Sequence, residues 1–284
     1  MPISGIQYVT ENHAKMAYEY IEKEDLQEGQ ASVLLSEMDG SMIPIVETSL
    51  LEGEFDKRKC RKTRWQEARL CMAREPNKVT SFFYSTLGDV DRAGDLLYRV
   101  ALKAGFGAAT QVHFVGDGAP WIVNQVRRVF GSQASYLVDF YHITEYLSEA
   151  AEHSWTSEKK EWLHRSQSLL KSNEHKDLLA NIRLRMPLDY ITEELLEDRK
   201  EESPVQKCYR YIVNRQDCLD YKKALEQDLP IGSGEIESAH RSVIQKRMKI
   251  PGAWWREDNA GNMLALRSLR ANGDWQNYWN YQAA

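Results

Sequence analysis

Three acidic residues that lie far apart in the sequence have the setting of metal-binding carboxylates. Asp39 and Asp117 each end an apolar run and precede a glycine, and Glu237 lies in the segment GSGEIESAHR. If Asp39 and Asp117 end neighbouring strands, their carboxylates lie close together, and both stay ionised only with a cation between them. A hard divalent ion that prefers oxygen ligands, Mg²⁺ or Mn²⁺, is the expected occupant.

The third carboxylate has two candidates, Glu235 and Glu237, both in the first turns of an expected helix, where the helix dipole favours negative charge. Because they are two residues apart, they point in different directions, and only one can reach the metals. Glu237 is favoured. Glu37 shares a strand face with Asp39 and is an alternative to it as a ligand. Each acid also has a non-catalytic interpretation. Asp39 and Asp117 are then turn residues, and Glu235 and Glu237 are surface acids at the start of a helix.

The expected elements follow the order β-β-β-α-β-α-β, then a helical block, then a further helix. Asp39-Gly40 predicts a hairpin turn between two strands within 31–47, and TRWQEARLCMAR predicts a third strand. Helical spacing from Val90 to Gly105 is followed by the strand QVHFVGD, the helix APWIVNQVRRVF and the strand ASYLVDF. Strands that alternate with helices predict an α/β fold, a mixed sheet covered on both faces.

Two basic stretches interrupt a chain of 284 residues whose net charge is −5. The first contains Lys57, Arg58, Lys59, Arg61, Lys62 and Arg64. The second contains Arg241, Lys246, Arg247, Lys249 and Arg256 without an acid, and includes Trp254 and Trp255. Cations beside aromatic rings suit contact with a nucleic-acid backbone and stacking on bases, and a solvated helix face over core tryptophans is the alternative.

The remaining composition narrows the class of protein. The acidic balance argues against a protein that coats nucleic acid, and no apolar stretch is long enough to span a membrane. The four cysteines lie far apart without a C-x-x-C pair, which argues against zinc and favours reduced thiols in the cytoplasm.

Four segments together resemble the bacterial insertion-sequence transposases of the DDE type, above all the ISKra-type group and more distantly the Mutator-like elements. They are MDG, GDGAPWI, VDFYHITEYL and IGSGEIESAHRSVIQKRMKIPGAWW. The resemblance covers roughly residues 31–279. It implies a ribonuclease H-like core with a five-stranded mixed sheet, interrupted by an all-α insertion. The expected divisions are a helical leader at 1–30, a core at 31–142 and 231–270, an insertion at 143–230 and a tail at 271–284.

The resemblance also implies site residues and partners. Asp39, Asp117 and Glu237 would be the catalytic triad and the ligands of two Mg²⁺ or Mn²⁺ ions, with Glu235 as the substitute. Asp139 and His142 match the accessory D-x-x-H signature, in which His142 contacts the phosphate or orients Asp139; an N-cap is the plain alternative for Asp139. The substrates would be DNA element ends and target DNA, handled by a homodimer in the bacterial cytoplasm and on the nucleoid, with no membrane.

Relatives of this type carry an N-terminal DNA-binding region, for which thirty residues are too few, so a truncated or domesticated copy is expected. Two other interpretations stay open. One is a ribonuclease H-like nuclease or resolvase that acts on structured DNA. The other is a catalytically inactive DNA- or protein-binding scaffold derived from a transposase. A nucleotide site at GSGE is disfavoured because the segment lacks the P-loop lysine.

Overall fold

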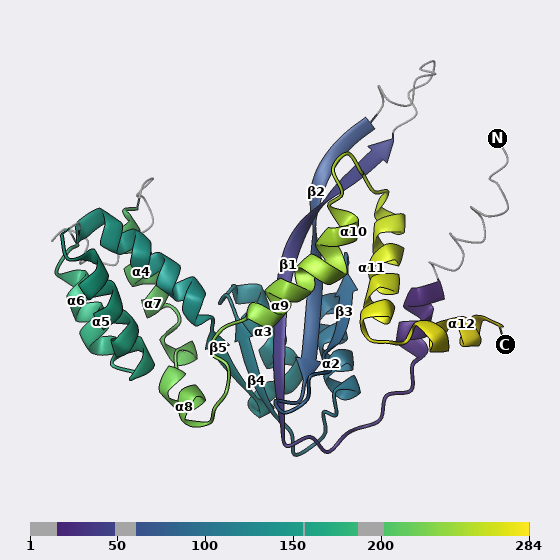
Figure 1. Cartoon of the computed structure of the whole chain (residues 1–284), viewed down its shortest axis with the longest axis horizontal. Coiled ribbons are helices and arrows are strands. Elements are labelled where there is room, and N and C mark those ends of the chain that lie inside the picture. Colours follow the sequence, from purple (N-terminus) through teal and green to yellow (C-terminus); the bar gives the residue numbers. More distant parts are fainter. Residues whose placement is uncertain (1–15, 49–60, 156, 187–201, 284) are drawn as a thin grey trace. The chain divides into compact units, whose positions relative to one another are not determined.

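The computed structural model describes residues 16–48, 61–155, 157–186 and 202–283. The chain divides into two compact units (Figure 1). Unit 1 comprises Met1–Phe114, Pro120–Ala134 and Gly234–Ala284, and unit 2 comprises Val115–Ala119 and Ser135–Ser233.

A five-stranded sheet runs in the order β3-β2-β1-β4-β5. The strands are β1 (Val33–Thr48), β2 (Arg61–Arg74), β3 (Phe82–Thr86), β4 (Gln111–Gly116) and β5 (Ala134–Val138). β1, β2 and β3 pair antiparallel, whereas the neighbours β4 and β5 are joined through helix α3 (Pro120–Phe130), the crossover that parallel strands require. This mixed sheet with flanking helices has the ribonuclease H-like strand order, which confirms the expected fold class.

The hairpin expected at Asp39-Gly40 is wrong. β1 is one continuous strand of 16 residues, in which Asp39 lies opposite Leu70 of β2 and Gly40 opposite Arg69. The turn preference of an Asp-Gly pair is local, and here a long partner strand satisfies the backbone on both sides of the pair. A Cβ at Gly40 would overlap the Glu67 side chain where it now lies, so a larger residue here requires that flexible side chain to move. Asp39 therefore lies within a strand and not at its end.

The strand β3 is a five-residue segment that was not predicted from the sequence. Its sequence, FFYST, is too short to show a clear alternation of apolar and polar residues.

Helices of unit 1 cover both faces of β1 and β2. On one face, Cys71 of β2 contacts Met38 of β1 and the carbonyl of Ala93 in α2 (Val90–Lys103). On the other face, Ile43 and Leu70 join a core formed with the helices that follow Gly234. Figure 1 shows α9, α10 and α11 on one side of the long strands β1 and β2. Those helices are α9 (Gly234–Ala239), the π-helical turn η5 (His240–Gln245), α10 (Lys246–Met248) and α11 (Glu257–Ala271).

The remaining regular elements of unit 1 are short. Residues 16–23 are helical, within the stretch expected to form a helical leader. A 3-10 turn, η1 (Gly131–Gln133), precedes β5, and α12 (Trp275–Ala283) follows α11.

Unit 2 contains the expected helical insertion. Its helices are α4 (Phe140–Ser154), α5 (Lys159–Lys171), α6 (His175–Arg183), α7 (Pro204–Val213) and α8 (Tyr221–Glu226), with the short turn η4 (Gln216–Cys218). They share one apolar core, in which Trp155 and Trp162 stack with their ring centres 4.0 Å apart. In the part of the chain that the structure describes, no helix is long and apolar enough to cross a bilayer.

Candidate functional site

A side chain of strand β1 caps α9, the helix that contains Glu237. Glu37, on β1, is 2% exposed, and its Oε2 accepts a hydrogen bond of 2.7 Å from the backbone N–H of Ile236 in α9. A carboxylate at a helix N-terminus satisfies an unpaired N–H group and is favoured by the helix dipole. Glu37 therefore has a structural role that the sequence did not reveal, and this role disfavours it as the alternative to Asp39.

Asp39 lies two residues further along β1, on the same face of the strand as Glu37. Its side chain is 40% exposed, and its Oδ1 accepts a hydrogen bond of 2.7 Å from Gly40 N–H. Its Oδ2 lies 3.4 Å from Nε2 of His240, a side chain that is 3% exposed. Burial lowers the pKa of His240 to about 4, so the imidazole is neutral at pH 7. Asp39 is thus a partly solvated carboxylate beside a buried neutral histidine.

His240 was not identified from the sequence. The available signal was its spacing from Glu237, because residues three apart lie on the same face of a helix. His240 also begins the π-helical turn η5, an irregularity that is frequent at functional sites.

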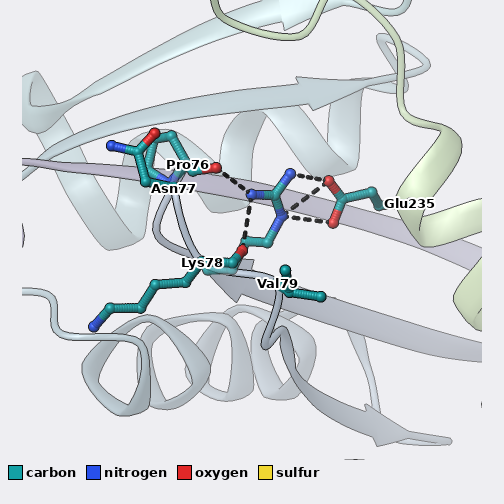
Figure 2. A pocket seen from close by; sticks show the side chains of 6 residues that line it. Pro76, Asn77, Lys78, Val79 and Glu235 are labelled. Atoms are coloured by element: carbon teal, nitrogen blue, oxygen red, sulfur yellow. Dashed lines mark hydrogen bonds and ion pairs between the residues drawn. The ribbon is translucent and has the colours of Figure 1, made fainter.

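The two acidic candidates on α9 differ in their surroundings. Glu235 is bound by Arg74, whose Nε lies 2.9 and 2.8 Å from its two carboxylate oxygens and whose Nη2 also donates to it (Figure 2). Glu237 is exposed, and its carboxylate has no ion-pair or hydrogen-bond partner among the described residues. Of the two, Glu237 is the carboxylate available to a ligand.

Figure 2 also shows that charged groups lining the pocket beside Glu235 already bind one another. This hollow of about 430 Å³ is lined by Arg74, Pro76, Asn77, Lys78, Val79 and Glu235. Nη1 of Arg74 donates to the carbonyls of Glu75, Pro76 and Lys78, and its other nitrogens donate to Glu235. The network fixes the turn between β2 and β3 to the start of α9.

Helices of unit 2 hold the loop that contains Asp117. The carbonyl of Asp117 accepts a hydrogen bond of 2.6 Å from the hydroxyl of Tyr211, and its Oδ1 accepts one of 2.8 Å from Ala119 N–H. Gly118 donates to the Tyr136 hydroxyl at 3.0 Å and accepts from Nε of Arg215 at 3.1 Å. Tyr211 and Arg215 of the helical insertion, together with Tyr136 of β5, therefore fix the backbone that follows the Asp117 side chain.

Gly118 adopts a φ of +77°, and a Cβ there would lie 2.5 Å from Nε of Arg215. The glycine is required by the left-handed backbone and by the arginine that packs on it.

Asp139 is the N-cap of α4 and is fully engaged. Its Oδ1 accepts from the backbone N–H groups of Tyr141 and His142 at 2.6 and 3.1 Å. Its Oδ2 accepts from Ser233, through the backbone N–H at 2.7 Å and through the hydroxyl. Four hydrogen bonds to a side chain that is 4% exposed favour the structural interpretation of Asp139 over a role as a metal ligand. Ser233, which the sequence did not single out, directly precedes α9.

His142 belongs to an aromatic cluster. Its ring lies edge-on to Tyr146 and Tyr211 at 5.5 and 5.7 Å, and these two tyrosines stack at 4.2 Å. Its Nδ1 lies 3.6 Å from the Glu145 carboxylate. His142 thus contacts the tyrosine that holds Asp117.

The predicted metal ligands are oxygen donors of the kind that Mg²⁺ and Mn²⁺ prefer. Asp39 and Glu237 lie in unit 1, and Asp117 lies in unit 2. Within the described residues, no three His, Cys, Asp or Glu side chains gather closely enough to hold a metal ion. The donor chemistry fits a divalent ion, and metal binding stays a prediction.

The predicted DNA-binding residues differ in their exposure and in their ion pairs. Lys57, Arg58 and Lys59 lie outside the described residues. Arg64 is ion-paired with Glu47 and Glu257 at 2.8 and 2.6 Å, so its charge is already balanced. In the described part of the two basic stretches, the exposed cations are Arg61, Lys62, Arg241, Lys246, Arg247, Lys249 and Arg256. Trp254 is exposed, whereas Trp255 is partly buried, with the Arg247 guanidinium 5.2 Å from its ring centre.

The strand order and the helical insertion after β5 define a ribonuclease H-like protein. The chain belongs to the Uncharacterised protein family UPF0236, whose sequence model matches residues 106–281. No curated protein matches the sequence. Among solved structures, the Drosophila P element transposase strand transfer complex is 12% identical, with 93% of this chain and 72% of that chain covered. Its TM-score of 0.28 is too low to bear on the fold or the activity.

Proposed function

We propose that this chain is the catalytic core of a DDE-type transposase that cleaves DNA strands and transfers them, with Asp39, Asp117 and Glu237 as its catalytic carboxylates. The observation that carries the proposal lies in unit 1. The helix after the insertion is capped by Glu37 of β1 and presents Glu237 without a competing ion pair, while Asp39 follows Glu37 on the same strand face. Two of the three acids that the resemblance implies thus lie in unit 1, in a chain whose sheet has the ribonuclease H-like strand order.

In this proposal, two bound Mg²⁺ or Mn²⁺ ions would activate the attacking oxygen and stabilise the leaving oxygen of a phosphodiester. Asp39 and Glu237 contribute carboxylates from β1 and α9. Asp117 contributes the third from a loop whose backbone Tyr211 holds. Neutral His240 adds no positive charge beside Asp39, so the carboxylate keeps its affinity for a cation. DNA element ends and target DNA would be the substrates, bound by a homodimer in the bacterial cytoplasm.

The test is divalent-ion-dependent nicking of DNA by the purified chain. We expect Asp39→Asn, Asp117→Asn and Glu237→Gln each to abolish nicking while the melting temperature changes little. Asp258→Asn is the matched control, because Asp258, like Glu237, is an exposed acid in the first turn of a helix. Undiminished nicking by the triad variants, or equal loss in the control, would refute the assignment.

A catalytically inactive DNA-binding scaffold is the second candidate. It is favoured by the structural role of Asp139, a predicted accessory acid whose carboxylate is engaged by Tyr141, His142 and Ser233. DNA binding without nicking in Mg²⁺ or Mn²⁺, on linear, supercoiled and branched substrates alike, would support this candidate. Strong preference for branched DNA would instead indicate the nuclease or resolvase.

A further inference from the structure

Two tryptophans contact each other on the surface of unit 1. Trp65 of β2 is 58% exposed and Trp254 is 44% exposed, and their ring centres lie 6.3 Å apart at an angle of 58°. Indole rings left in water are unfavourable unless another molecule covers them, and large aromatic rings dominate the energy of interfaces. The pair is therefore a candidate interaction surface, and Trp65 was not recognised from the sequence.

The backbone next to Trp254 is tied to β1. Trp255 donates its N–H to the Pro44 carbonyl at 3.1 Å, and its carbonyl accepts from Val46 N–H at 2.7 Å. Pro44 lies directly opposite Trp65 in the pairing of β1 with β2. The two exposed rings are consequently held beside each other by the sheet, and little conformational entropy is lost when a ligand covers them.

Exposed cations precede both tryptophans along the chain. Arg61 is exposed on the same face of β2 as Trp65, and Lys246, Arg247 and Lys249 are exposed on the segment that leads to Trp254. Two acids of this region, Glu47 and Glu257, share the single positive charge of Arg64, which offsets one of their two negative charges. The charge fits a polyanion.

We propose that Trp65 and Trp254 form a platform on which unpaired bases of single-stranded DNA stack, while the neighbouring cations contact the phosphates. The inference rests on the proposed function and deepens it, because it names DNA with unpaired bases as the form that this surface binds. A base exposes its ring face only when it is unpaired or unstacked, so a duplex can use only the cations. A platform of this kind is tolerant of base sequence.

The experiment measures binding of the full chain to a fluorescent single strand of roughly 15 nucleotides and to the matched duplex, in EDTA. We expect Trp65→Ala and Trp254→Ala each to weaken single-strand binding about tenfold and to leave duplex binding nearly unchanged. Trp254→Phe should retain most of the affinity, since a phenyl ring still stacks. The matched control is Trp275→Ala. Trp275 is 40% exposed and contacts Trp279, but α12 carries no charged residue.

Binding in EDTA separates this inference from the proposed catalysis. Loss of single-strand binding in the two alanine variants supports the platform, even where the wild-type chain fails to nick DNA. The platform is overturned if both variants bind the single strand as tightly as Trp275→Ala does. It is equally overturned if single-strand and duplex affinities fall together, or if the wild-type chain binds no single strand, which would indicate a protein partner.

Discussion

The carboxylate of Glu37 on β1 accepts a hydrogen bond from the backbone N–H of Ile236, although 199 positions separate the two residues in the sequence. The contact ties the start of α9 to the strand that bears Asp39. Because the carboxylate is buried, its loss leaves a helix N–H group without a partner in an environment from which water is excluded.

We therefore expect Glu37→Ala to lower the free energy of unfolding by about 1–3 kcal/mol. Glu37→Gln should cost less, because the amide oxygen still accepts the hydrogen bond. Glu47→Ala is the control: it removes an exposed ion pair on the same strand and should cost less than about 1 kcal/mol. Urea denaturation measures all three, and equal losses in Glu37→Ala and Glu47→Ala would contradict the capping role.

Asp139 supports a second prediction, made for stability alone. Asp139→Ala removes both the N-cap of α4 and the acceptor of Ser233, so a loss of about 2–4 kcal/mol is expected. Ser233→Ala keeps the backbone N–H bond and removes only the hydroxyl, and should cost about 1 kcal/mol. A loss in Asp139→Ala no larger than that in Ser233→Ala, measured by urea denaturation, would show that the cap contributes little.

The sequence predicted β2, β4, β5, the crossover helix and the helical insertion because long periodic segments carry that information locally, but it divided β1 in two and missed β3. It misplaced Asp39 because an Asp-Gly pair promotes a turn only when no partner strand continues the ladder, and β2 does continue it. Glu37 and Trp65 could not be assigned from spacing. Their roles depend on α9 and on Trp254, which lie almost two hundred residues away.

Gly118 allows a comparison between two glycines with the same backbone conformation. Gly118 has a φ of +77° and Gly252 a φ of +78°, but only Gly118 would place a new Cβ against a neighbour, Arg215. Gly252→Ala should cost about 1 kcal/mol, the strain of a left-handed alanine. Gly118→Ala should cost clearly more and should displace the loop of Asp117. Equal melting temperatures for the two variants would mean that Arg215 moves away freely.

The buried His240 predicts a pH dependence of stability in metal-free buffer. Burial lowers its pKa from 6.5 to about 4, with the Asp39 backbone opposing the shift and the Lys249 charge adding to it. The unfolded chain therefore binds a proton below pH 6.5, whereas the folded chain does so only near pH 4. The contribution of this group to stability is complete above pH 6.5 and is lost as the pH falls toward 4, by about 3 kcal/mol in all.

The measurement compares wild type with His240→Gln by urea denaturation from pH 7 to pH 5, a range in which the Asp39 carboxylate remains ionised in the unfolded chain. The wild type should lose up to about 1.4 kcal/mol per pH unit more than the variant over the lower part of this range. Parallel pH profiles would show that the imidazole is solvated or protonated in the folded protein. Such a result would mean that the folded imidazole takes up a proton as readily as the unfolded one, so that below about pH 6.5 a cation beside Asp39 would compete with a metal ion for the carboxylate.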